Sequence, residues 1–153
     1  MVAETLKLLK KTGNEHVSEK IFTKKELDEL ITDKSDRELV KKILELLQDS
    51  KAEDIVLIDV RDSSNLADYI FICDGRSQLH CRGIAENIVF RLKLQGEIHL
   101  GIEGGLEGNW VLLDYGNIIL HVFHPEIRKY YNLEKLYAPN QLRTAFKNLT
   151  PAN

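Results

Sequence analysis

The apolar run Asp54–Val60 limits the folds that are open to this chain. It reads Asp-Ile-Val-Leu-Ile-Asp-Val, so it is continuous, short and rich in β-branched residues. Such a run is typical of a strand that is buried on both faces. A second run of this kind, Tyr69–Cys73, is closed by the turn residues Asp74-Gly75. Two strands of this type need helices on both faces of their sheet, which predicts an α/β fold.

The segments after residue 74 complete the predicted sheet. A long helix is expected from Ser77, a plausible N-cap, to Gly96, which suits a left-handed C-terminal cap. The segment 114–117, Asp-Tyr-Gly-Asn, is a good hairpin connection, and Pro125 suits the first turn of a short helix that ends near Tyr131. Three further strands are expected at Ile98–Ile102, Trp110–Leu113 and Ile118–Phe123. The order predicts a mixed five-stranded sheet flanked by helices.

The first fifty residues lack strand signals and contain two capping boxes, in which a hydroxyl accepts a hydrogen bond from the amide three residues later. Thr23 with Glu26 opens one helix, and Ser35 with Glu38 opens a stronger one. We therefore divide the chain into a helical or partly flexible N-terminal extension (1–35), an α/β domain (36–138) and a C-terminal tail (139–153).

Charge and composition restrict the class of partner. The 153 residues carry a formal net charge of -3 and have a pI near 6.0, which argues against a direct nucleic-acid binder and is compatible with a basic protein partner. No apolar run approaches the roughly 18 residues of a membrane helix, and residues 1–11 resemble no targeting signal. Cys73 and Cys81 have no metal-site spacing, so we expect reduced, buried thiols in a cytoplasmic protein.

The sequence contains no convincing pattern for a catalytic or metal site. His121 and His124 are three residues apart, which sends them to opposite faces of a strand, so a shared metal ion is not expected. Gly75-Arg76-Ser77 offers free amides that suit an anion, but it lacks the further glycines and the Gly-Lys-Ser/Thr ending of a phosphate loop. A turn at Gly75 and a cap at Ser77 are therefore the favoured explanation. We expect no enzyme activity, no cofactor and no metal site.

A more informative group of residues surrounds Trp110. Trp110, Leu112 and Asp114 share strand parity, so they lie on one face, beside a glycine-rich loop that carries Glu103 and Glu107. Tryptophan often anchors binding hot spots, and carboxylates complement lysine or arginine of a partner. The end of the domain adds Tyr130, Tyr131, Glu134, Leu136 and Tyr137. This pattern indicates a docking surface for a basic protein; the alternative is a core tryptophan at a strand start.

The same residues carry a resemblance to a known family. The matching blocks are Asp54–Val60, Ser63-Ser64 with Asp68-Tyr69, Ile72-Cys73 with Gly75 and Ser77, Gly101–Gly104, Trp110–Gly116, His121–Phe123, and Tyr131 with Leu133, Glu134, Leu136 and Tyr137. Over residues 36–138 the chain resembles the ribosomal silencing factor family, also called RsfS or Iojap-like. Two departures are that residues 1–35 extend beyond the usual family start, and that Tyr137 stands where the family usually has tryptophan.

The resemblance implies a nucleotidyltransferase-like fold that lacks the catalytic carboxylates. It implies binding to universal large-subunit ribosomal protein fourteen, on the face that meets the small subunit, so that subunit joining is blocked and translation is repressed. Organelle relatives act in large-subunit assembly, family members are often homodimers, and an active nucleotidyltransferase is a less favoured alternative. The partner-binding residues that it implies are Glu103, Gly104, Trp110, Asp114, Tyr115, Tyr131, Glu134, Leu136 and Tyr137.

Overall fold

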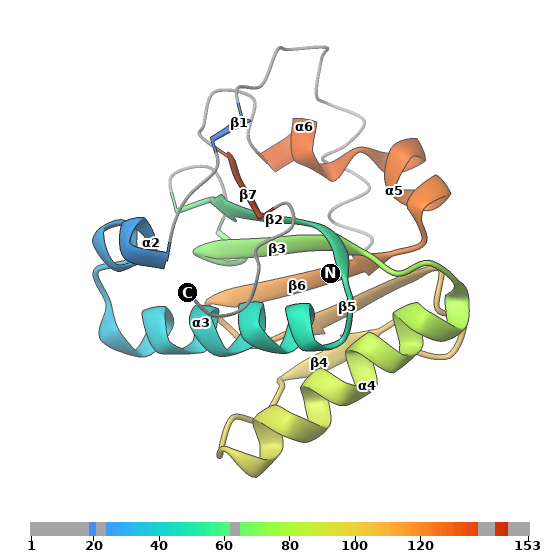
Figure 1. Ribbon diagram of the computed structural model, residues 1–153, viewed down its shortest axis with the longest axis horizontal. Coiled ribbons are helices and arrows are strands. Elements are labelled where there is room, and N and C mark those ends of the chain that lie inside the picture. Colours follow the sequence, from blue (N-terminus) through green and yellow to red (C-terminus); the bar gives the residue numbers. More distant parts are fainter. Residues whose placement is uncertain (1–18, 21–23, 62–64, 138–142, 147–153) are drawn as a thin grey trace.

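The fold is built on one mixed sheet with helices on both of its faces (Figure 1). The computed structural model describes residues 19–20, 24–61, 65–137 and 143–146. The strands are β1 (Glu19–Lys20), β2 (Glu53–Asp59), β3 (Tyr69–Asp74), β4 (Gly101–Glu103), β5 (Trp110–Asp114), β6 (Ile118–Phe123) and β7 (Arg143–Phe146). The helices are α2 (Lys24–Leu30), α3 (Lys34–Asp49), α4 (Gln78–Leu94), α5 (Pro125–Tyr131) and α6 (Leu133–Tyr137).

The strand order is β1-β7-β2-β3-β6-β5-β4. The central pair β3 and β6 is parallel, whereas β2 with β3, β5 with β6 and β4 with β5 are antiparallel. The predicted mixed sheet of five strands, β2 to β6, is therefore confirmed. Two short strands that were not predicted, β7 and β1, extend it beyond β2.

Alternate residues of the strands feed two apolar clusters, one on each face of the sheet. The larger cluster joins Leu57, Phe71 and Leu120 to the apolar faces of α2, α3 and α4. The smaller one lies on the opposite face, where Ile58 and Ile72 pack with Phe123 under α5 and α6. Figure 1 shows this layering, with α3 and α4 below the sheet and α5 and α6 above it. The expectation of strands buried on both faces is confirmed.

The long helix α4 begins and ends as expected. The Ser77 hydroxyl accepts a hydrogen bond from the amide of His80 at 3.0 Å, and Gly96 follows the last turn with a φ of 85°. Gly75 brings the end of β3 against this helix, because a Cβ there would lie 2.6 Å from Sγ of Cys81. Cys73 and Cys81 are both buried free thiols, as predicted, and burial raises the pKa of each.

The start of α3 differs from the prediction. Its N-cap is Asp33, whose carboxylate accepts from the amide of Asp36 at 2.8 Å, so Ser35 lies inside the helix and does not cap it. Both patterns place an acceptor three residues before an amide; the carboxylate that comes first in the chain makes the bond. The proposed Thr23 cap lies outside the described residues.

Two strand boundaries also differ. The strand expected at Ile98–Ile102 is observed as β4, Gly101–Glu103, because only these residues pair with β5; Ile98 and Leu100 are exposed outside the ladder. Strand β7 lies in the segment expected to be a tail, and it pairs antiparallel with β2. The division of the chain after residues 35 and 138 stays a prediction.

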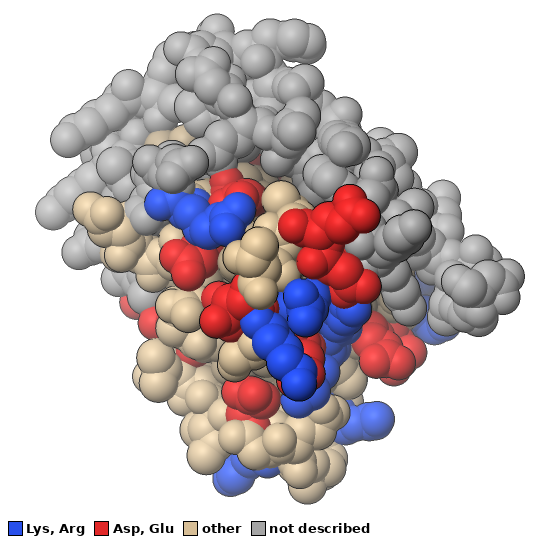
Figure 2. All heavy atoms as spheres, turned by 90° about the vertical axis from the view of Figure 1, so that its left-hand side faces the viewer, with Lys and Arg blue, Asp and Glu red and all other residues tan. Residues whose placement is uncertain are grey.

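Charge is mixed on the side of the molecule that carries α2 and the start of α3. Asp28 of α2 forms ion pairs with Arg37 and Lys41 of α3, which ties the two helices together. Among the residues that Figure 2 colours, basic and acidic side chains lie side by side on this face. Among the described residues, no helix is long and apolar enough to cross a membrane.

Candidate partner-binding groove

A groove of about 400 Å³ brings four of the predicted binding residues together. It lies between the end of β4, the 104–109 loop, the start of β5, and α5. Its lining combines aromatic and apolar side chains with carboxylates. The lining residues are Glu103, Gly104, Glu107, Asn109, Trp110, Ile127 and Tyr131. We call this the Trp110 groove; two of its seven lining residues are acidic and none is basic.

Trp110 is held by aromatic neighbours on the sheet and on α5. Its ring centroid lies 4.9 Å from that of Phe123, with a stacked geometry, and 4.9 Å from that of Tyr131. Its indole N–H donates to Nδ1 of His121 at 2.9 Å. The side chain is partly buried and lines the groove. Trp110 therefore combines the two predicted roles, those of a core residue and of a docking residue. One part of its side chain packs in the smaller cluster, and another part is accessible.

His121 is a neutral acceptor inside this cluster. It is 1% exposed, and burial lowers its pKa from 6.5 to about 3. Because Nδ1 accepts from Trp110, the ring proton is assigned to Nε2. His124 instead caps α5, where its Nδ1 accepts from the amide of Glu126 at 3.4 Å. No group of three potential metal ligands occurs among the residues that the structure describes.

The loop before β5 depends on Gly104. Its φ is 75°, and a Cβ at this position would fall on the carbonyl oxygen of Trp110. We expect Gly104→Ala to displace the loop and to lower the free energy of unfolding by about 2 kcal/mol or more, since the left-handed conformation alone costs 1–2 kcal/mol with a side chain. The measurement is urea denaturation followed by circular dichroism.

Gly105→Ala is the matched control for this variant. Gly105 has no positive φ, and its Cβ would make only an ordinary contact, 3.5 Å from Cγ2 of Ile102. We expect its free energy of unfolding to stay close to that of the unchanged protein. Equal stability of the two variants would mean that the 103–109 loop is not held in the conformation described.

Asp114 and Tyr115 lie away from the groove. Asp114 is on the same face of β5 as Trp110, but Leu112 between them is 1% exposed, so the two do not form a continuous exposed surface. The carboxylate of Asp114 accepts from the amide of Gly116 at 2.8 Å and so fixes the hairpin turn. Tyr115 packs against the larger cluster, and burial raises its pKa to about 12.

The predicted residues of α6 form a third group. Glu134 is 7% exposed, and its carboxylate accepts from Nε of Arg128 at 2.6 Å, so a direct contact with a partner would compete with this ion pair. Leu136 packs against the smaller cluster. Tyr137 ends α6, and its side chain lies outside what the structure describes. The nine residues therefore divide among the groove, the hairpin turn and the α6 region.

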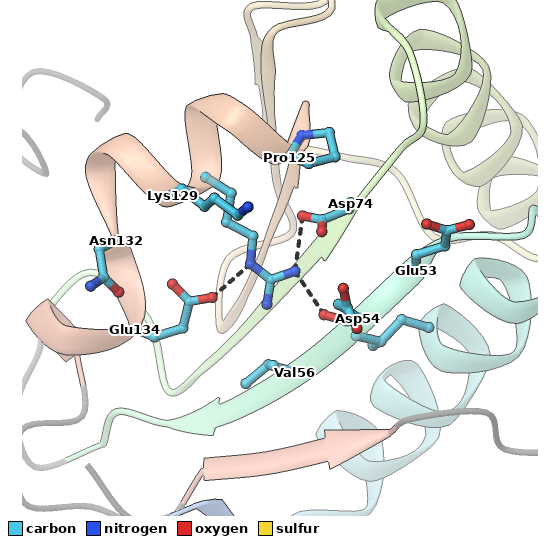
Figure 3. Close-up of a pocket in the computed structure, with 10 residues that line it drawn as sticks. Glu53, Asp54, Val56, Asp74, Pro125, Lys129, Asn132 and Glu134 are labelled. Atoms are coloured by element: carbon cyan, nitrogen blue, oxygen red, sulfur yellow. Dashed lines mark hydrogen bonds and ion pairs between the residues drawn. The ribbon is translucent and has the colours of Figure 1, made fainter. Parts of the chain in front are cut away.

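Sequence reasoning missed the ion-pair network around Arg128. Its guanidinium bonds to Asp74 at 2.9 Å, to Glu134, and to the backbone carbonyl of Asp54 at 2.8 Å. Figure 3 shows these groups converging at a second pocket, of about 580 Å³, between β2 and α5. The sequence feature that could have indicated this network is Asp74 at the end of a buried strand, because a buried carboxylate needs a cationic or hydrogen-bonding partner.

The anion site considered at residues 75–77 is largely occupied by the protein itself. The amide of Arg76 donates to Nδ1 of His80 at 2.9 Å, and the amide of His80 donates to the Ser77 hydroxyl. The amide of Cys81 donates to the carbonyl of Ser77. The expectation that Ser77 caps the helix is confirmed, and the amides of Gly75 and Arg76 already donate to groups of the protein.

Comparisons with known proteins agree with this organisation. A family model described as "Ribosomal silencing factor during starvation" matches residues 33–152. The protein named ribosomal silencing factor RsfS in Halalkalibacterium halodurans is 37% identical over 103 residues, which are 67% of this chain and 88% of that protein. The mouse protein named "Mitochondrial assembly of ribosomal large subunit protein 1" is 32% identical over 98 residues, which are 62% of this chain and 43% of that protein.

The fold comparison points the same way. A crystal structure of a protein from Chromobacterium violaceum is 33% identical and superimposes with a TM-score of 0.64, over 66% of this chain and 84% of that one. The matched span of the family model contains strands β2 to β7 and every residue of the Trp110 groove. On this evidence the chain belongs to the ribosomal silencing factor family.

Proposed function

We propose that this protein binds the large ribosomal subunit through universal large-subunit protein fourteen and blocks subunit joining. The observation that carries the proposal is the Trp110 groove, whose lining combines two carboxylates with two aromatic side chains. Leu106, 90% exposed on the 104–109 loop, offers an apolar contact close in sequence to the lining residues Gly104 and Glu107. In this proposal the groove, rather than the whole Trp110 to Asp114 face, is the centre of the docking surface.

The chemistry of the groove fits a basic protein partner. An arginine or lysine of the partner can stack on Trp110 or Tyr131 while its charge pairs with Glu107. The lining residues include no Lys or Arg that would repel such a side chain. Aromatic anchors with a charged rim are also the usual composition of binding hot spots.

Occlusion requires no chemical step from the protein. A bound domain prevents the small subunit from occupying the same face whenever its concentration and affinity exceed those of the competing association. The proposal therefore describes a translational repressor and not an enzyme, with no cofactor. It places the protein in the cytoplasm with the ribosomes, and it includes the homodimer suggested by the resemblance as an expectation.

Charge reversal at the exposed rim tests the docking surface. We expect Glu107→Lys to weaken binding to purified large subunits by about tenfold, equivalent to 1.4 kcal/mol, because a lysine there repels a basic partner. Glu45→Lys on the exposed face of α3 makes the same change in net charge outside the groove and should bind normally. Binding is measured by co-sedimentation, and inhibition of subunit joining by sucrose-gradient profiles.

Two outcomes would contradict the proposed docking surface. If Glu107→Lys binds and inhibits joining as well as Glu45→Lys does, the Trp110 groove is not the docking surface. Loss of binding by both variants to the same extent would mean that only net charge matters, which also contradicts the proposal.

Large-subunit assembly is the second candidate function. The mouse relative is named for that role in mitochondria, and it shares 32% identity with this chain. Both functions use the same docking surface but differ in the particle that is bound. Association with precursor particles alone, measured by gradient fractionation of a lysate, would favour assembly; association with mature large subunits favours silencing.

A further inference from the structure

A buried charge network lies beside the Trp110 groove. Direct contact with a partner does not explain why these charges are buried. Arg128 lies on α5, and its side chain is only 11% exposed. Its Nη1 donates to the Asp74 carboxylate of β3 and to the Asp54 carbonyl of β2, and its Nε donates to Glu134 of α6. One guanidinium therefore joins four elements of the fold.

Each acceptor is arranged to receive this guanidinium. The side chains of Asp74 and Glu134 are both 9% exposed, so neither carboxylate is well solvated without Arg128. Asp54 has a φ of 47° and lies where the register of β2 against β3 shifts, between Glu53 and Val56. A bulge of this kind leaves a residue outside the ladder, and here its carbonyl bonds to Arg128. Figure 3 shows Asp54, Asp74 and Glu134 around the pocket.

The network also fixes the helix that forms one wall of the groove. Tyr131 is three residues after Arg128 on α5 and, with Ile127, lines the Trp110 groove. None of the seven residues of α5 is fully buried, so apolar packing alone holds this helix weakly. A bond from the amide of His124 to the carbonyl of Asn109 fixes its N-terminal end. Arg128 supplies the corresponding attachment of its C-terminal half.

We infer that Arg128 is a positioning residue for the Trp110 groove. Its bonds to β2, β3 and α6 hold α5 so that Tyr131 stays against Trp110, which keeps the groove formed before a partner arrives. The consequence for ribosome binding rests on the function proposed above, but the positioning itself is a property of the free protein.

The single tryptophan of the chain, Trp110, reports on this positioning directly. In Arg128→Lys the charge remains, but an ammonium lacks the fork of donors that reaches acceptors on three sides. We expect acrylamide to quench Trp110 fluorescence more strongly in this variant than in the unchanged protein, because Tyr131 no longer stays packed against it. The double variant Arg128→Met/Glu134→Gln, which removes one unpaired carboxylate, should show the same rise.

A control must separate local positioning from a general loss of stability. Ile88→Val shortens a fully buried side chain of α4 in the cluster on the other face of the sheet, away from the groove. It lowers the free energy of unfolding modestly, since one buried methylene group is lost. We expect its Trp110 quenching to match that of the unchanged protein. Quenching is compared at 25 °C under conditions in which circular dichroism shows every variant folded.

Affinity for large subunits gives the functional readout. If the formed groove falls to about a tenth of the population, the apparent affinity of Arg128→Lys falls about tenfold. Unchanged quenching in both folded Arg128 variants would overturn the inference. Increased quenching with unchanged subunit binding would leave the positioning role standing and would instead contradict the groove as the docking surface.

Discussion

The variant Trp110→Ala is expected to lose binding to the large ribosomal subunit altogether and to unfold more easily. The indole contacts Phe123 and Tyr131 and donates a hydrogen bond to His121, so its removal leaves a cavity and an unused acceptor. Because Trp110 is only partly buried, we expect a loss of about 3 kcal/mol, at the lower end for tryptophan truncations. Urea denaturation followed by far-ultraviolet circular dichroism measures this loss, and co-sedimentation with purified subunits measures binding.

Two control variants separate the surface from the packing. Leu44→Ala, in the cluster on the opposite face of the sheet, should cost a similar amount of stability and leave subunit binding unchanged. Trp110→Phe keeps a ring between Phe123 and Tyr131 but loses the indole donor, so we expect intermediate affinity. Normal binding by Trp110→Ala would exclude this tryptophan from the docking surface, whatever its effect on stability.

Local patterns predicted most of the sheet because these strands are buried on both faces and their ends carry clear turn signals. Asp54–Val60 and Ile118–Phe123 were predicted within one residue of their observed bounds. Strand β7 could not be predicted in this way. It is short and polar at its start, reading Arg-Thr-Ala-Phe, and it forms by pairing with β2, a contact between segments far apart in the sequence.

The candidate site was predictable in its chemistry but not in its boundaries. Strand parity placed Trp110 and Asp114 on one face correctly, and the adjoining Glu103 does line the groove. Parity says nothing about spacing along the strand, where four residues span about 13 Å. Nor does it show that Leu112 is buried between them. Asp114 consequently serves the hairpin turn, while Tyr131, from a later helix, completes the groove.

Glu134 illustrates a different limit. Its position among tyrosines near the end of the domain suggested an acidic contact for a partner, yet its carboxylate bonds to Arg128. A sequence shows which residues are charged but not which of them form ion pairs. Here the partner of Glu134 is Arg128 on the preceding helix, which also bonds to Asp74 of β3. Glu134 therefore belongs to an internal ion-pair network with Arg128 of α5, the helix that also carries Tyr131.

Stability should depend on pH through the buried His121. Burial lowers the pKa of folded His121 from 6.5 to about 3, so between these values the unfolded chain binds a proton that the folded protein does not. The free energy of unfolding therefore falls as pH decreases from about 6.5, with a contribution from this site of up to about 1.4 kcal/mol per pH unit. Denaturation curves at pH 7, 6 and 5 measure the slope.

His121→Gln isolates this contribution, because a glutamine amide oxygen still accepts from the indole of Trp110 but does not titrate. We expect the variant to lose less stability than the unchanged protein between pH 6.5 and 5, and His99→Gln, which removes a histidine outside the groove lining, to retain the full slope. Since the acceptor of the Trp110 indole must be neutral, protonation of His121 also breaks the bond that orients the tryptophan. Because the folded pKa is about 3, His121 stays neutral between pH 6.5 and 5, so subunit binding by the folded protein should not weaken through this site in that range. Equal slopes for the two proteins would show that His121 titrates in the folded state as it does in the unfolded one.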